Sequence, residues 1–127
     1  MPPQIQNVSA ADQQDIRDAI QDAINHLTTQ ITDAELQSCI REKLHDDATV
    51  IIGGGDKCDA TTLGYTDWTR FGPFVSKSRE IHLCLTNIRR GGHRLGARIM
   101  HELAHVCCWP DGGGKGVPEN GEDWRIG

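Results

Sequence analysis

The chain has 127 residues, of which 37% are hydrophobic, and a net charge of −5. This size fits a single domain over residues 1–127 with one core. No apolar run approaches the ~18 residues of a membrane-spanning helix, and no signal peptide is visible at the start. The net negative charge argues against a nucleic-acid partner. We therefore expect a monomer that uses neither a membrane nor a nucleic acid as its partner.

Hydrophobic periodicity predicts two N-terminal helices. The first covers residues 9–31, with Ser9 as its N-cap. The second begins at Thr32, which would form a capping box with Glu35. The apolar residues that recur every three or four positions should face the core: Ile16, Ile20, Ile24, Leu27 and Ile31, then Leu36, Ile40 and Leu44.

The second half of the chain contains strand patterns and one further helix. Residues 50–52 form a short strand before three glycines, residues 56–73 form an irregular loop, and alternation over residues 80–86 predicts the clearest strand. A helix follows over residues 93–107, and Pro110 prevents it from continuing. This order predicts an α+β domain, in which a small sheet packs on helices.

Five cysteines, at positions 39, 58, 84, 107 and 108, are many for a reducing compartment. We expect two disulfides and one spare thiol in a protein that is secreted or delivered. Cys107 and Cys108 should point about 100° apart on a helix and so have different partners. The connectivity stays open.

Residues 101–105 read His-Glu-Leu-Ala-His, an H-E-x-x-H motif on the predicted helix. Positions four apart share one helix face, so His101 and His105 can each direct a ring nitrogen at one metal ion. Glu102 lies beside that face and can reach a water on the ion without being a ligand. This combination is typical of a zinc peptidase site.

On this motif the chain resembles the zincin metallopeptidases. The resemblance covers residues 80–111, where a strand precedes the motif helix at a zincin-like distance. It implies one Zn²⁺ per chain, Glu102 as the general base, and an edge strand that aligns a peptide above the motif helix.

The third zinc ligand decides the branch of that family. The metzincin pattern, in its snapalysin-like form with a final Asp, places Cys108 at a usual Gly and Asp111 at the ligand position. A gluzincin-like site would use Glu119 or Glu122 instead. His82 and His93 are further alternatives. The chain lacks the downstream Met of metzincins, since Met100 is its last methionine.

Three other groups of polar residues receive weaker assignments. Tyr65 is a candidate for stabilising the oxyanion. The basic cluster of Arg89, Arg90, Arg94 and Arg98 is interpreted as a solvated helix face. The histidines at positions 26, 45 and 93 are expected to face solvent.

The sequence therefore predicts a zinc-dependent metalloendopeptidase acting on a peptide or protein substrate, in the manner of a small toxin or effector protease. Its metal ligands would be His101, His105 and Asp111, with Glu102 as the catalytic base. The alternative is a non-catalytic protein-binding module, held together by zinc or only by disulfides. A carboxylate at position 102 speaks against that alternative, because a purely structural site has no need of one.

Overall fold

The computed structural model describes residues 1–71, 74–119 and 124. Its elements in chain order are β1 (Gln4–Gln6), α1 (Ala10–Gln30), α2 (Ala34–Leu44), β2 (Val50–Gly53), β3 (Gly64–Phe71), β4 (Phe74–Leu83), α3 (Leu85–Arg90) and α4 (Leu95–Val106). The predicted α+β class is confirmed. No helix within these residues is both long and apolar enough to cross a membrane.

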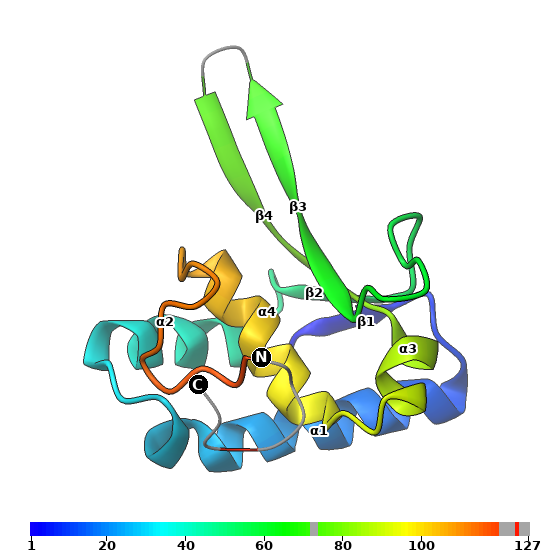
Figure 1. Ribbon diagram of the computed structural model, residues 1–127, viewed down its shortest axis with the longest axis horizontal. Helices are drawn as coiled ribbons and strands as arrows, with labels where there is room; N and C mark the ends of the chain where they lie inside the picture. The colour runs from blue at the N-terminus through cyan, green and yellow to red at the C-terminus, as the bar shows by residue number, and fades with distance from the viewer. Residues whose placement is uncertain (72–73, 120–123, 125–127) are drawn as a thin grey trace.

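The strands form one mixed sheet in the order β1-β2-β4-β3 (Figure 1). β1, β2 and β4 run parallel, whereas β3 pairs antiparallel with β4 and forms one edge of the sheet. The long β3–β4 hairpin projects away from the helices. The outer strand of this hairpin begins beside α4, so it brings a sheet edge to the H-E-x-x-H helix.

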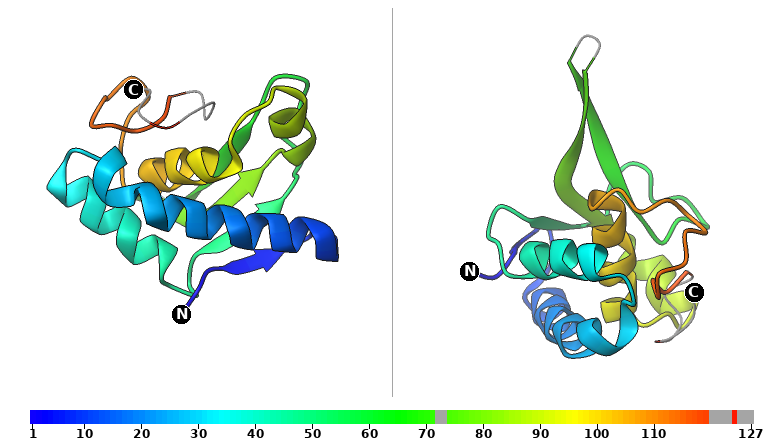
Figure 2. Two further views of the ribbon diagram at one scale, coloured as in Figure 1. Left: turned by 90° about the horizontal axis from the view of Figure 1, so that it is seen from below. Right: turned by 90° about the vertical axis from the view of Figure 1, so that its left-hand side faces the viewer.

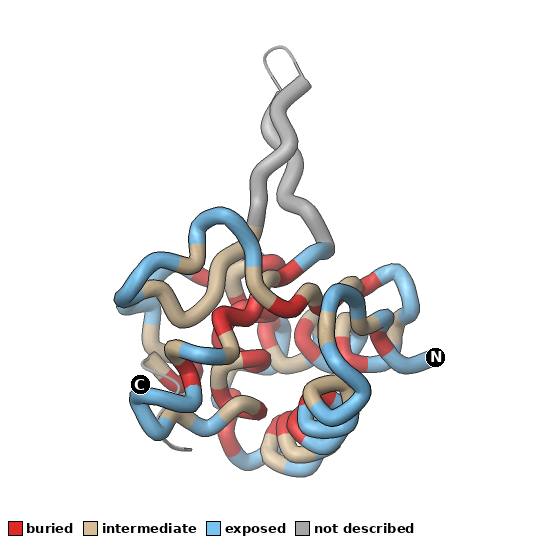
Figure 3. Tube along the Cα trace, turned by 90° about the vertical axis from the view of Figure 1, so that its right-hand side faces the viewer, coloured by how far each residue is buried: buried red, intermediate tan, exposed pale blue. Residues whose placement is uncertain are grey.

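Helix α4 lies between α1 and the sheet, and α2 packs beside it (Figure 2). Its small residues permit this close packing. A Cβ atom on Gly96 would lie 2.7 Å from a carboxylate oxygen of Asp22 and 2.9 Å from the backbone oxygen of Ala19, both on α1. Nine of the twelve residues of α4 are buried, and the buried residues of the domain gather in its interior (Figure 3). The motif therefore stands on the best-packed helix of the domain.

The two long helices form as predicted, with one difference at a cap. Ser9 caps α1 by accepting a hydrogen bond from the Asp12 amide, as predicted. The cap of α2 is Asp33 rather than Thr32, because the Asp33 carboxylate accepts from the Leu36 amide at 2.9 Å. The predicted capping box with Glu35 is therefore wrong.

Three differences concern the sheet. The predicted loop over residues 56–73 contains β3, which pairs with β4 and with no other strand of the described residues. The strand predicted over residues 80–86 ends at Leu83, and the chain turns at Cys84 into α3. The short strand β1 was not predicted; it is held by parallel pairing with β2, which lies over 40 residues later.

Two disulfides form, between Cys39 and Cys107 and between Cys58 and Cys84. Cys108 keeps a free, exposed thiol. The predicted count of two bridges and one spare thiol is confirmed, as are the different partners of the adjacent residues 107 and 108. The Cys39–Cys107 bridge ties α2 to the end of α4, two residues after the motif.

Candidate metal centre

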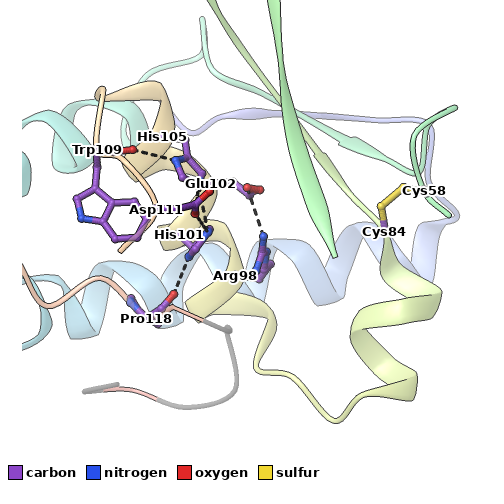
Figure 4. Close-up of polar contacts among 9 residues, drawn as sticks. All are labelled: Cys58, Cys84, Arg98, His101, Glu102, His105, Trp109, Asp111 and Pro118. Carbon is purple, nitrogen blue, oxygen red and sulfur yellow. Dashed lines mark hydrogen bonds and ion pairs between the residues drawn. A yellow bond between two sulfur atoms is a disulfide. The ribbon is translucent and has the colours of Figure 1, made fainter. Parts of the chain in front are cut away.

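The two motif histidines meet on a face of α4 that borders a cleft. The start of β3, Arg98 and Asp111 line the same cleft. Their Nε2 atoms lie 3.1 Å apart (Figure 4). His101, Glu102 and His105 each offer a ligand atom within 4.8 Å of the others, so this group could hold a metal ion. His101 and Glu102 are 3% and 2% exposed, whereas the His105 side chain is 20% exposed at the mouth of the group.

Backbone carbonyls orient both imidazole rings. Nδ1 of His101 donates to the Pro118 oxygen at 2.7 Å, and Nδ1 of His105 donates to the Trp109 oxygen at 2.9 Å. A carbonyl oxygen only accepts, so each Nδ1 must carry a proton, and Nε2 of either ring presents a lone pair when that ring is in its neutral form. Two facing lone pairs do not bond to each other, whereas a cation satisfies both. This outer support is the arrangement that metal-binding histidines use.

His101 stays neutral at physiological pH. Its burial, reinforced by the positive charge of Arg98, lowers the pKa of the imidazole to about 4. The neutral ring is the form that binds a metal, so protons do not compete for His101 near pH 7.

Asp111 brings a carboxylate to the same point from beyond the end of α4. Its Oδ1 lies 3.1 Å from Nε2 of His105 and 3.6 Å from Nε2 of His101. The Asp111 side chain is otherwise 80% exposed. Three electron-rich atoms therefore converge on one position.

The turn that returns Asp111 to the helix is made at Cys108. This residue has φ of +68°, the left-handed conformation that favours glycine. The Trp109 amide then donates to the Ala104 oxygen at 2.9 Å and closes the turn. The metzincin pattern has a glycine at this position. The chain makes the turn here with a cysteine in place of that glycine. Gly112 to Gly114 come after the turn, so they are not needed for it.

We expect Cys108→Gly to be more stable than Cys108→Ala by about 1 kcal/mol, because only glycine adopts this φ without a Cβ penalty. Alanine is the matched control, since both changes remove the exposed thiol. Urea unfolding monitored by circular dichroism measures the difference. Equal stability of the two variants would contradict strain at this turn.

Glu102 points its carboxylate into the cleft next to the histidines. Oε1 lies 3.6 Å from Nη2 of Arg98, and Oε2 is buried without a hydrogen-bond partner among the described residues. Burial raises the pKa of the Glu102 carboxyl, and Arg98 partly offsets this rise. A buried carboxylate with an uncommitted oxygen fits a group that exchanges protons with a bound molecule.

The first residue of β3 leaves room for Glu102. A Cβ atom on Gly64 would lie 3.0 Å from Oε2 of Glu102 and 2.8 Å from the His82 backbone oxygen. A side chain at this position would push against the carboxylate. Gly64 thus lets the sheet edge approach the motif helix.

Residues 115–117 are anchored to the core. The Gln30 side chain donates to the Gly116 oxygen, and the Thr32 amide donates to the Lys115 oxygen. Val117 is fully buried. This anchoring fixes the Pro118 carbonyl that orients His101, a support that sequence reasoning missed because a backbone oxygen leaves no pattern.

The other candidate ligands are placed differently. Glu119 is half-buried and, unlike Asp111, forms no ion pair with either motif histidine among the described residues, while Glu122 lies outside those residues. His82 directs Nδ1 at the Gly54 oxygen. His93 is half-buried, and its Nδ1 has no hydrogen-bond partner among the residues described.

Tyr65 lines the cleft, but its hydroxyl donates to Asp56 at 3.3 Å and its ring stacks on His82. Its role in stabilising an oxyanion stays a prediction. Of the two histidines expected to be surface residues besides His93, His45 is exposed, whereas His26 stacks on Trp124.

The predicted solvated basic face is wrong for one of its members. Arg89 pairs with Asp12 and Asp15, and Arg94 pairs with Asp22, all at the surface. The Arg98 side chain, by contrast, is only 11% exposed and lines the cleft. The sequence did carry a signal for this, since Arg98 stands four residues before Glu102 on the same helix face.

No family model, no curated protein and no solved structure matches this chain. The candidate site therefore rests on its own geometry and chemistry.

Proposed function

We propose that this chain is a zinc-dependent metallopeptidase of the zincin type, with His101, His105 and Asp111 as ligands and Glu102 as general base. The observation that carries the proposal is the convergence of two Nε2 lone pairs and one carboxylate oxygen beside a buried glutamate. Three protein ligands leave a fourth position for water, as in catalytic rather than structural zinc sites.

The spacing of the donor atoms supports zinc. Tetrahedral ligands at the usual zinc distances of about 2.0–2.1 Å lie about 3.3 Å from one another. The three separations between the donor atoms are 3.1, 3.1 and 3.6 Å. Calcium and magnesium prefer sets made only of oxygen ligands, so two imidazoles argue against them.

The cleft supplies the other parts of a hydrolytic site. Zinc, when bound, polarises a peptide carbonyl and lowers the pKa of water towards about 7. Glu102 accepts the proton of the attacking water and returns it to the leaving amine. A carboxyl with a raised pKa suits both steps, because it can hold the proton between them.

The edge of the sheet offers a place for the substrate backbone. Residues 64–66 of β3 form a wall of the cleft that holds the motif residues and Asp111, with a volume of about 310 Å³. Along its other side, β3 pairs with no strand in the described part of the chain. An extended peptide can add to such an edge by main-chain hydrogen bonds and so lie across the metal position.

Metal analysis and proteolysis together test the proposal. We expect the purified protein to contain about one zinc per chain, and His101→Ala to lose it, because the remaining donors no longer enclose the ion. Plasma mass spectrometry measures the metal, and hydrolysis of a mixed peptide library, with and without a chelator, measures activity. His45→Ala, at an exposed position, is the matched control and should keep the zinc.

The absence of stoichiometric metal from the wild type would contradict the site itself. Stoichiometric zinc without hydrolysis of any peptide would instead favour the non-catalytic module.

A further inference from the structure

Among the described residues that line the cleft, Arg98 has the one charged side chain that the proposed chemistry does not use. Its side chain is 11% exposed, yet its only ion pair within the described chain is a long one, 3.6 Å from Nη2 to Oε1 of Glu102. Its buried Nε has no hydrogen-bond partner among the described residues. A guanidinium has five donors, and a buried one is costly unless charges and acceptors satisfy it. Arg98 thus retains capacity for a second anionic partner.

The positions of the charged side chains along the cleft indicate where this anionic partner of Arg98 would bind. Asp111 comes from beyond the end of α4, whereas Arg98 belongs to its first turn and flanks Glu102 on the opposite side (Figure 4). Glu102 must reach the nitrogen of the leaving amine in order to return its proton. The residue that carries this amine therefore lies on the Glu102 side, within reach of Arg98.

We propose that Arg98 binds a carboxylate carried by the residue that follows the scissile bond. Two sources supply this group: an acidic side chain inside a longer peptide, or the terminal carboxylate when that residue is the last. A planar guanidinium matches either one, because it can donate two parallel hydrogen bonds to one carboxylate. The identity of the ligand as a peptide rests on the proposed peptidase function.

The charge of the cleft agrees with an anionic ligand. Besides Tyr65, its ionisable residues are Glu102, Asp111, Arg98 and the two histidines. A divalent ion with Arg98 brings three positive charges against two carboxylates, so the loaded cleft has a surplus of one positive charge. A substrate carboxylate neutralises this surplus.

Binding of non-hydrolysable peptides to the zinc-loaded protein tests the inference without relying on turnover. Four probes carry a reduced bond at the cleavage position. Two are longer peptides with Glu or Gln after that bond, and two end on Ala after that bond, as free acid or as amide. Isothermal titration calorimetry gives each Kd. We expect at least one acid to bind about 10–100-fold more tightly than its neutral twin, the usual size for hydrogen bonds to a charged group. The pair that shows the difference identifies the source of the carboxylate.

Three variants assign the effect to Arg98. Arg98→Met should abolish the preference, and Arg98→Lys should retain part of it, because a lysine keeps the charge without the bidentate geometry. Arg94→Met, which removes an exposed arginine one turn earlier, should leave it unchanged. Zinc content and thermal melting establish that each variant is folded. If Arg98→Met does not fold, a reduced preference in Arg98→Lys tests the role of Arg98 instead.

Equal affinity within both pairs for the wild type, or a preference that survives in Arg98→Met, overturns the inference. The same sequences can also be made with an ordinary peptide bond at the cleavage position. If the binding preference holds but none of these peptides is cut, the carboxylate site stands and the peptidase function fails. If substrates are cut at equal rates whatever follows the bond, the peptidase stands and the carboxylate site fails.

Discussion

Glu102→Gln should keep its zinc and lose peptide hydrolysis by about 10³-fold, within the range usual for removal of a general base. Glutamine has the shape of glutamate but cannot accept the proton of the attacking water. The metal should stay, because in the proposed site the two imidazoles and Asp111 are the ligands. Zinc content and kcat/KM for a cleaved peptide are the two measurements.

Glu35→Gln is the matched control, since it makes the same change at an exposed position of α2. An active Glu102→Gln protein would rule out the mechanism. Loss of zinc from that variant would show that Glu102 is a ligand rather than a base, which its distance from the histidines also permits.

Asp111→Ala should weaken zinc binding by more than about 100-fold, beyond the 10–100-fold usual for a supporting residue outside the ligand set. The expected reason is the loss of one of three donors, because Oδ1 of Asp111 lies near both Nε2 atoms. The side chain is 80% exposed, so its removal should leave the metal-free protein about as stable as before. Competition with a chromogenic chelator gives the affinity, and urea unfolding without metal gives the stability.

Glu119→Ala is the control for Asp111, because Glu119 follows the Pro118 carbonyl but, unlike Asp111, forms no ion pair with either motif histidine among the described residues. If Glu119→Ala or Glu122→Ala released the zinc while Asp111→Ala held it, the site would be gluzincin-like.

The parts of the fold that sequence predicted are those governed by local rules. The long helices α1 and α2 follow from apolar periodicity, and α4 from the spacing around the motif. The strands β1 and β3 depend on partners elsewhere in the chain, so their own residues indicate them weakly. A hairpin signal was nonetheless present, since aromatic and β-branched residues flank Gly72 and Pro73 on both sides.

The candidate site likewise has parts that the sequence predicted and parts that it did not. The i, i+4 spacing of His101 and His105 placed two donors together, and the family pattern pointed to Asp111. The Pro118 and Trp109 carbonyls that orient the rings are backbone groups, which no residue type marks. Arg98 was misplaced because a charged residue on a helix is usually solvated, whereas this one lies under the sheet edge.

The Cys39–Cys107 bridge should make zinc binding depend on the redox state of the surroundings. It holds the end of α4, two residues after His105 and just before the turn that returns Asp111. A metal held by the proposed ligands would stabilise the same turn as the intact bridge, so each would favour the other by the same factor. Zinc should therefore lower the reduction potential of the bridge, and thiol reductants should lower the affinity for zinc. An oxidising compartment would then assemble the site, and a reducing one would loosen it.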